Sequence, residues 1–331
     1  MYNGSRFEAP QLVPERLLSM ANIPRICVVG SSNIDLMFRT PRLPRPGETL
    51  TGRDFHFGFG GKGANQAVMA ARLGAAVTMI TKVGRDVFGE GTLRNYQAEG
   101  IDTIHLLRDA EQPSGVAGIV VDDAAQNCII LAPGANSRLT PEEVRGAARA
   151  IEAAHVLLCQ LEVPVETTQA AFRIARAAGV RTILNPAPAC QLPDDLLRLA
   201  DLCVPNETEL AELTGFAVEE LNQVETAARQ LRQKGPGMVI VTLGARGAMI
   251  VNDRGAERLA AVPVTPVDTT GAGDAFIGSL AVFLAEGQPL AEAVRMANAV
   301  AALSVTRIGT QTSFPKRAEV EAFLRNRRLD G

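Results

Sequence analysis

The 331-residue sequence contains no tryptophan, and its aromatic residues together make up only 4% of the chain. It also has no excess of charge of one sign. The 33 Lys and Arg residues are balanced by 36 Asp and Glu residues, which gives a formal net charge of -3. A chain without a basic excess has no global electrostatic reason to bind nucleic acid or an anionic membrane. We therefore expect neither partner, and any anionic ligand must be held by a local site.

Cysteine, histidine and long hydrophobic runs are scarce as well. No C-x-x-C pair occurs among the five cysteines, so their spacing predicts neither a disulfide framework nor a zinc site. The three histidines belong to no motif. The longest strongly apolar run, residues 275–285, is too short to span a bilayer. Residues 1–24 lack the basic and apolar regions of a secretory signal, so a cytoplasmic location is expected.

What the chain does contain is a regular alternation of apolar runs and helical segments. Strands are expected at 25–30, 77–83, 156–160, 180–184 and 237–243. Helices are expected at 63–73, 89–99, 140–154, 164–178, 207–214, 219–234, 272–286 and 290–306. This order predicts an α/β fold, with a doubly wound, mostly parallel sheet flanked by helices. Residues 25–331 would form this domain, after an irregular N-terminal extension at 1–24.

Two segments interrupt the alternation. Residues 35–59 contain three prolines and then alternate polar and apolar residues in the manner of a strand, and residues 114–132 have the pattern of a hairpin. Both are expected to form a small antiparallel β lid attached to the α/β domain.

The first of two glycine clusters lies at residues 58–63. Gly58, Gly60 and Gly63 satisfy G-x-G-x-x-G, the pattern of dinucleotide-binding folds. That pattern should follow the first strand and precede an acidic residue about twenty positions on. Here the first strand ends earlier, at Gly30, and Lys82 occupies the acidic position. A nicotinamide site is therefore disfavoured, and so is a phosphate-binding P-loop, whose spacing also differs.

The second cluster, Gly271-Ala272-Gly273-Asp274, opens an expected helix. Backbone N–H groups at a helix start, together with the helix dipole, form a site for an anion. Asp274 is open to two interpretations. It would either cap the helix or serve as a general base next to a bound phosphate.

Together the two clusters resemble the signatures of the ribokinase-like (PfkB) carbohydrate kinases, and the resemblance extends over residues 26–323. The segments that carry it are GSSNID at 30–35, PGET at 46–49, GGKGANQA at 60–67, QLE at 160–162, NPAPA at 185–189, PNETE at 205–209 and TLGARG at 242–247. The resemblance implies ATP-dependent phosphorylation of D-ribose to D-ribose 5-phosphate. It implies that Asp274 is the general base and that Gly271, Ala272 and Gly273 form the anion hole.

The resemblance also assigns the sugar ligands. They are Asn33, Asp35, Gly61, Lys62, Asn65, Glu162 and Asp274. Three of these side chains have ordinary alternatives. Asp35 would also suit a turn, Lys62 a solvated loop, and Glu162 the start of the next helix.

For the nucleotide, the resemblance implies that Asn206 and Glu209 organise Mg²⁺ and phosphate, largely through water. The same spacing also fits an N-cap with its capping box. Further ATP contacts are implied at Thr242, Gly244, Arg246, Gly247, Gly273 and Asn298.

An activating K⁺ ion is implied next to the anion hole. Its ligands would be Asp268, Thr270, Ser304, Arg307, Gly309 and Ser313, mostly through backbone carbonyls. A homodimer formed through the lid is implied as well. The alternatives are another sugar or nucleoside kinase, such as a deoxyribokinase or fructokinase, and a catalytically silent sugar-binding regulator.

Overall fold

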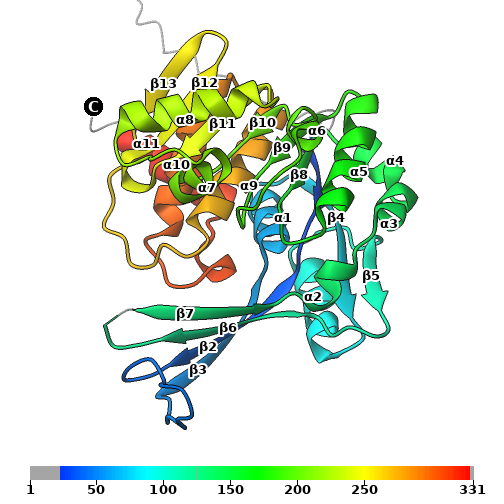
Figure 1. Ribbon diagram of the computed structural model, residues 1–331, viewed down its shortest axis with the longest axis vertical. Coiled ribbons are helices and arrows are strands. Elements are labelled where there is room, and N and C mark those ends of the chain that lie inside the picture. Colours follow the sequence, from blue (N-terminus) through cyan, green and yellow to red (C-terminus); the bar gives the residue numbers. More distant parts are fainter. Residues whose placement is uncertain (1–22, 125, 329–331) are drawn as a thin grey trace, which may run out of the picture.

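The computed structural model describes residues 23–124 and 126–328, so the expected extension at 1–24 lies almost entirely outside the described residues. A sheet of nine strands forms the centre of the molecule (Figure 1). In spatial order the strands are β13 (Gly255–Leu259), β12 (Ala248–Asn252), β11 (Met238–Thr242), β10 (Leu202–Cys203), β9 (Arg181–Leu184), β8 (Val156–Cys159), β1 (Arg25–Val29), β4 (Ala76–Gly84) and β5 (Leu106–Asp109). The strands from β11 to β5 run parallel, β12 is antiparallel to β11, and β13 is antiparallel to β12. The predicted parallel sheet is confirmed.

Helices cover both faces of this sheet, because successive residues of its central strands point to opposite sides. Ile26 and Val28 of β1 belong to one apolar core, with α1 (Lys62–Arg72), α9 (Ala272–Ala285) and α10 (Leu290–Ser304). Cys27 and Val29 belong to the other, with helices that include α5 (Val165–Ala177) and α8 (Leu221–Gln233). The continuous apolar runs of the sequence are therefore strands buried on both faces.

The other helices connect these layers. They are α2 (Val87–Ala98), α3 (Pro141–Gly146), α4 (Ala148–Glu152), α6 (Asp194–Leu197), α7 (Glu207–Thr214) and α11 (Arg317–Arg328), with short 3₁₀ turns η2 (Gly134–Arg138), η3 (Gly244–Arg246) and η4 (Gln311–Ser313). The helix expected at 140–154 begins as predicted, with a capping box between Thr140 and Glu143, but it is interrupted at Ala147. Gly146, a weak helix former, immediately precedes the break. Within the described ranges, no helix is both long enough and apolar enough to cross a membrane.

A second, separate sheet extends from one side of the molecule (Figure 1). Its order is β3 (Asp54–Gly60), β2 (Asn33–Arg39), β6 (Gly115–Val121) and β7 (Asn127–Ala132). The outer pairs are antiparallel, as expected for the lid, whereas the central pair β2–β6 is parallel. β2 begins at Asn33, so the first lid strand includes two residues before the predicted boundary at 35.

Candidate active site

The predicted site residues gather at one edge of the large sheet, the edge formed by the carboxyl ends of its parallel strands. Asn33 and Asp35 follow β1, Glu162 follows β8, Asn206 follows β10, and Thr242 ends β11. Open α/β sheets bind their ligands at this edge, in crevices outside the ends of the strands. The topology therefore brings together residues that lie far apart in the sequence.

The start of α9 has the backbone geometry of an anion site. Its N-cap, Gly271, has a left-handed conformation with φ of 76°. A Cβ at this position would also lie 2.6 Å from Thr310 Cγ2, so glycine is required for two reasons. A Cβ on Gly273 would meet open space. The first N–H groups of a helix have no acceptor within it. The N–H of Ala272 donates to the Thr269 carbonyl of the preceding turn at 3.2 Å, and the N–H of Gly273 is suited to an incoming anion.

Asp274 lies in the first turn of α9 and is only 8% exposed. Two amides from α1 hold its carboxylate: Asn65 Nδ2 donates to Oδ2 at 2.9 Å, and Gln66 Nε2 donates to Oδ1 at 3.0 Å. Burial raises the pKa of Asp274 above its usual range, against the lowering effect of Lys62 and of the two amides. The alternative that Asp274 caps its own helix is wrong, because the N-cap is Gly271 and its cap bears no side-chain hydrogen bond.

Glu162 connects two segments of the predicted sugar site, 30–35 and 60–67, through one oxygen. Its Oε2 accepts hydrogen bonds from Ser31 Oγ at 2.5 Å, from the backbone N–H of Lys62 at 3.0 Å and from Asn33 Nδ2 at 3.4 Å. Glu162 does not cap the following helix α5, whose N-cap is Pro164. Gly61 lies next to this group, since a Cβ there would be 2.7 Å from the backbone nitrogen of Asn33.

Lys62 is the cation in the middle of these acids. Burial alone would lower the pKa of its ammonium group, but the carboxylates of Asp274, Glu162 and Glu209 outweigh burial and raise the pKa above the usual value. Lys62 therefore stays charged. It is not the solvated loop lysine that its sequence position also allowed.

Asp35 shares this enclosed space. Burial, followed by the nearby charges of Glu162 and Asp274, raises the pKa of Asp35 to about 6. A Cβ on Gly60, in the neighbouring strand β3, would collide with both oxygens of the Asp35 carboxylate. The glycine-rich segment thus makes room for an acid side chain rather than for a dinucleotide.

The predicted nucleotide residues form a second group beside the first. Asn206 caps α7 and forms a reciprocal capping box with Glu209, and both carboxylate oxygens of Glu209 accept from Asn206, each at 2.9 Å. Burial raises the pKa of Glu209, against the lowering effect of the Asn206 N–H and Lys62. The N-cap and capping box that the spacing also allowed are therefore present. Asn206 also forms a β-bridge with Thr242 of β11.

The turn after β11 carries the remaining nucleotide residues. Arg246 forms an ion pair with Glu207 of α7. Gly244 and Gly247 have φ values of 54° and 94°. A Cβ on Gly247 would collide with the carbonyl oxygen of Leu259, which also accepts a hydrogen bond from Asn298 Nδ2 at 3.4 Å. Asn298 is thus placed beside this turn, although it lies in α10.

The residues predicted to hold a monovalent cation are also brought together. Asp268 accepts from the backbone N–H of Thr270 and from that of Gly309, each at 2.9 Å. Burial would raise the pKa of Asp268, but these hydrogen bonds outweigh burial and lower it. The carbonyl of Ser304 accepts from the N–H of Arg307 at 3.2 Å, and Ser313 belongs to the same loop as Gly309.

Two side chains that the sequence did not single out also take part. Gln66 bonds Asp274 directly, and Gln311 of η4 donates from Nε2 to Asn65 Oδ1 at 3.0 Å. Gln66 follows Asn65 in the glycine-rich segment and is fully buried, but nothing in the local pattern identified its partner. Gln311 lies between the predicted cation residues 309 and 313, so it links that loop to the acid site.

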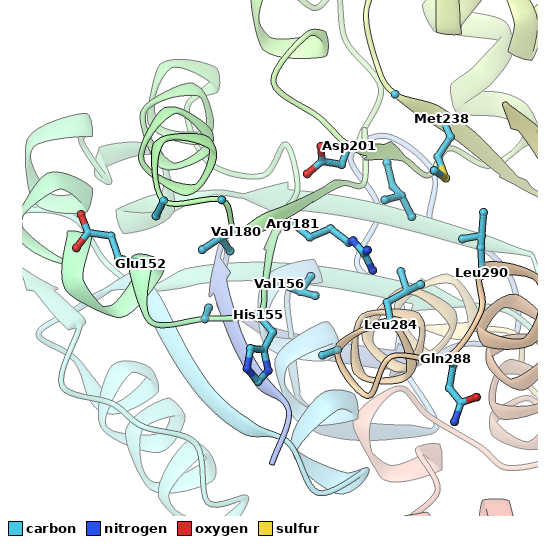
Figure 2. Close-up of a pocket in the computed structure, with 16 residues that line it drawn as sticks. Glu152, His155, Val156, Val180, Arg181, Asp201, Met238, Leu284, Gln288 and Leu290 are labelled. Atoms are coloured by element: carbon cyan, nitrogen blue, oxygen red, sulfur yellow. The ribbon is translucent and has the colours of Figure 1, made fainter. Parts of the chain in front are cut away.

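A hollow of about 740 Å³ lies elsewhere (Figure 2). His155, Arg181 and Met238 line it, and they stand at the amino ends of the strands, the opposite edge of the sheet. None of the predicted site residues is part of its wall. The size of a cavity therefore does not identify the active site in this fold.

Comparison with known proteins identifies the family. The family model described as "pfkB family carbohydrate kinase" matches residues 24–317. The chain belongs to the pfkB family of carbohydrate kinases. It is 42% identical over 299 residues to a ribokinase of Haemophilus influenzae, which covers 90% of this chain and 98% of the relative. It is also 41% identical over 300 residues to a deoxyribokinase of Salmonella typhi, with coverage of 90% and 98%.

A solved structure of this pfkB kinase fold agrees closely. The Arabidopsis thaliana ribokinase complexed with ribose and ATP superposes with a TM-score of 0.87 at 32% identity, over 91% of this chain and 99% of that one. The expected α/β fold with a separate small sheet is therefore confirmed. So is the assignment to the carbohydrate kinases, which makes this chain a phosphotransferase.

Proposed function

We propose that this pfkB kinase phosphorylates D-ribose with ATP and releases D-ribose 5-phosphate and ADP. The observation that carries the proposal is the position of Asp274, a buried carboxylate in the first turn of α9, directly after the Gly271–Gly273 anion site. The names of the similar proteins, several of them ribokinases, support ribose as the acceptor.

In the proposed reaction, the primary hydroxyl oxygen of the sugar attacks the γ-phosphorus of ATP in line with the leaving oxygen of ADP. Asp274 accepts the hydroxyl proton. The N–H groups of Gly271, Ala272 and Gly273 stabilise the charge on the phosphoryl group in flight, as a preorganised helix start can do. A raised pKa suits Asp274 to this role, since a base works best when its pKa approaches the working pH.

The sugar would lie among Asn33, Asp35, Gly61, Lys62, Asn65 and Glu162. These groups supply both donors and fixed acceptors, which a ring of hydroxyl groups needs. The small sheet provides Asn33 and Asp35, so it is well placed to close over the sugar and exclude water.

Asp274→Asn tests the assignment of the base. Asparagine has the same shape and keeps the fold, but it cannot accept the proton, so we expect kcat to fall at least ~10²-fold. Ribose affinity measured by calorimetry and the melting temperature should change little. Near-normal turnover in this variant would rule out Asp274 as the base.

The nucleotide would be held by Asn206, Glu209, Thr242, Gly244, Arg246, Gly247, Gly273 and Asn298. Both carboxylate oxygens of Glu209 already accept hydrogen bonds from Asn206. The pair therefore fits a metal ion that it contacts through water molecules, and Mg²⁺ tends to keep its water ligands. When bound, Mg²⁺ neutralises charge on the β- and γ-phosphates.

A K⁺ ion would be held by Asp268, Thr270, Ser304, Arg307, Gly309 and Ser313, mostly through carbonyl oxygens. The fit rests on the hydrogen bonds from Thr270 and Gly309 to Asp268, which join the segment directly before α9 to the loop after α10. When bound, the cation adds positive charge beside the anion site. We expect turnover to rise when K⁺ replaces a bulky organic cation at constant ionic strength. Equal rates would contradict the site.

The second candidate is deoxyribokinase activity, which the Salmonella typhi relative favours at nearly the same identity. A coupled assay for ADP release across ribose, deoxyribose, fructose and adenosine distinguishes the sugars by kcat/KM. It also tests the silent-regulator alternative, for which no sugar would release ADP. We further propose a cytoplasmic homodimer that forms through the lid.

A further inference from the structure

The turn η2, directly after lid strand β7, contributes a buried amide that the proposed reaction does not use. Asn136 is 1% exposed, and each of its polar atoms is bonded. Its Oδ1 accepts from the backbone N–H of Ser32 at 2.9 Å. Its Nδ2 donates to the Ser32 carbonyl at 3.2 Å and to Asn33 Oδ1 at 2.7 Å.

These bonds dictate which way the Asn33 amide faces. A backbone N–H can only donate, so Asn136 must turn its oxygen to Ser32 and its NH₂ group to Asn33. Asn33 accepts this hydrogen bond with its Oδ1, so its NH₂ group lies on the side of Glu162, 3.4 Å from Oε2. A polar chain from the Ser32 backbone through Asn136 therefore sets the donor that Asn33 offers in the sugar site.

The bond between the two asparagines also lies at the root of the lid. Asn33 is the first residue of β2 and pairs with Gly115, the first residue of β6. A Cβ on Gly115 would collide with both Asn136 Nδ2 and Asn33 Oδ1. Glycine at 115 thus leaves the space in which this hydrogen bond forms.

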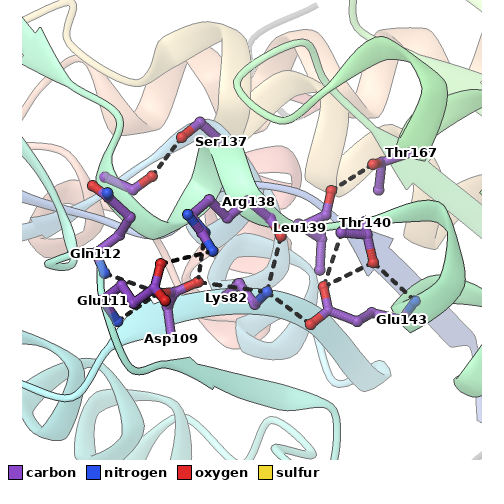
Figure 3. A network of polar contacts seen from close by, with 11 residues as sticks. Lys82, Asp109, Glu111, Gln112, Ser137, Arg138, Leu139, Thr140, Glu143 and Thr167 are labelled. Carbon is purple, nitrogen blue, oxygen red and sulfur yellow. Dashed lines mark hydrogen bonds and ion pairs between the residues drawn. The ribbon is translucent and has the colours of Figure 1, made fainter.

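A cluster of charged side chains, of which Lys82 and Asp109 are buried, anchors η2 itself (Figure 3). Lys82 Nζ donates to the carbonyl of Arg138, the last residue of η2, at 2.9 Å, and forms an ion pair with Glu143 at 2.7 Å. Asp109 of β5 lies 3.6 Å from Lys82 Nζ and 3.2 Å from Arg138 Nε. Asn136 is therefore held on a support built from β4, β5 and α3, outside the sugar site.

We propose that Asn136 is a positioning residue for sugar binding, which acts by orienting the Asn33 amide so that its NH₂ group faces the sugar and Glu162. The inference rests on the proposed function, in which Asn33 binds the sugar. It adds a residue that does not touch the substrate but decides whether Asn33 donates or accepts there.

Asn136→Asp tests the orientation with almost no change of shape. The carboxylate can still accept from Ser32 N–H, but it turns an oxygen rather than an NH₂ group toward Asn33. The Asn33 amide must then rotate and present its oxygen to Glu162, where it repels. We expect KM for ribose to rise about tenfold, the effect of one misdirected hydrogen bond, while KM for ATP changes less than about twofold.

The decisive measurement is a cycle with Asn33→Ala. If Asn136 acts through Asn33, the double variant has a ribose KM no higher than that of Asn33→Ala alone, because the orientation no longer matters. Effects that multiply, or a parallel rise in KM for ATP, would overturn the inference. If Asn33→Ala leaves ribose KM unchanged, the proposed sugar site itself is wrong, and the inference is overturned with it.

Two further variants separate positioning from loss of stability. In Gly115→Ala the added methyl group, on lid strand β6, would collide with both atoms of the hydrogen bond between Asn136 and Asn33. This variant should therefore raise ribose KM even if Asn136→Asp fails to fold. Unchanged ribose KM in a folded Gly115→Ala protein counts against the inference. Thr182→Val is the control: it removes a buried hydroxyl that bonds the Leu199 carbonyl at 2.7 Å, at the opposite edge of the sheet. It should lower the melting temperature without changing either KM.

Discussion

Asp35 carries the most specific electrostatic consequence at the scale of single residues. Burial, then Glu162 and Asp274, raises the pKa of Asp35 to about 6, so this acid titrates close to neutral pH. In the proposed reaction its carboxylate accepts a hydrogen bond from a sugar hydroxyl. The burial and the nearby carboxylates that raise the pKa of Asp35 therefore make sugar binding depend on pH.

We predict that ribose affinity falls between pH 7.5 and pH 5, as Asp35 takes up a proton. With a pKa of about 6, roughly nine tenths of Asp35 is protonated at pH 5, so Kd should rise about tenfold if only the carboxylate binds. Titration calorimetry at a series of pH values measures this. Asp35→Asn should bind weakly with a much flatter pH profile. A wild-type profile as flat as that of the variant would contradict the prediction.

The same residue should affect stability in the opposite direction. The folded-state pKa of Asp35 lies above the ordinary value of 3.8, so between about pH 4 and pH 6 the folded state binds more protons than the unfolded state. Stability from this group therefore decreases as pH rises through that window. We predict that Asp35→Asn raises the melting temperature at pH 7.5 and that the gain shrinks toward pH 4. Thermal unfolding by circular dichroism tests this, and a lower melting temperature at pH 7.5 would contradict it.

At the scale of elements, strand β3 shows how a glycine-rich segment serves the site. Gly58 pairs with Asp35 of β2, and Gly60 pairs with Asn33, but the surroundings of the two glycines differ. A Cβ on Gly60 would collide with the Asp35 carboxylate, whereas one on Gly58 would meet nothing within 4 Å. One glycine is required by the acid, and the other is not.

We therefore predict that Gly60→Ala displaces Asp35 and raises KM for ribose about tenfold or more, on the order of one lost hydrogen bond to a charged group. Gly58→Ala, two residues away on the same strand, is the matched control and should leave KM unchanged. Steady-state kinetics on both variants, with circular dichroism to verify folding, tests the pair. Equal kinetics in the two would mean that space beside Asp35 is not limiting.

How far the elements can be predicted from sequence depends on their length and burial. β1, β4, β8, β9 and β11 are apolar runs buried on both faces, so composition alone located them. β5, with the sequence LLRD, contains only two apolar residues and is mostly half-buried, and the two-residue β10 is too short to show a pattern. The β12–β13 hairpin and α11 carried no motif that drew attention to them. β2 begins at Asn33, within the GSSNID segment, whose sequence showed no sign of a strand before residue 35.

The candidate site followed the same logic. Its acids and glycines lie in motifs after strands, and the carboxyl ends of parallel strands meet at one edge. Gln66, Asn136 and Gln311 were missed because a lone amide has no local signature. Their partners are distant in sequence, 208 residues away for Gln66 and 246 for Gln311. Only the three-dimensional arrangement shows that Gln66 bonds Asp274, that Gln311 bonds Asn65 and that Asn136 bonds Asn33.

For the whole molecule, the unexplained feature is the apolar surface of the small sheet. Register places Phe38 opposite Phe55, and Phe57 in one cross-strand row with Leu36, Gly118 and Ile130. Phe38, Phe55, Phe57 and Ile130 therefore share one face, and they are 42%, 52%, 49% and 71% exposed. Asp35 lies one position from Leu36 and so points to the opposite face. A contiguous apolar patch of this kind is typical of an interface, and it leaves the face toward the sugar free.

We predict that two copies of the chain pair through this face. Ile130→Glu places a charge at the β7 end of the patch, where burial without a partner is unfavourable, so the dimer should dissociate. Ile129→Glu is the matched control, because Ile129 is 58% exposed but lies one position along β7, on the Asp35 side of the sheet. Sedimentation velocity at micromolar concentration distinguishes the two states. A wild-type monomer would exclude the dimer, and an Ile130→Glu dimer would place the interface elsewhere. Equal dissociation of both variants would show that the sheet does not pair through one face, because the two isoleucines differ in little else.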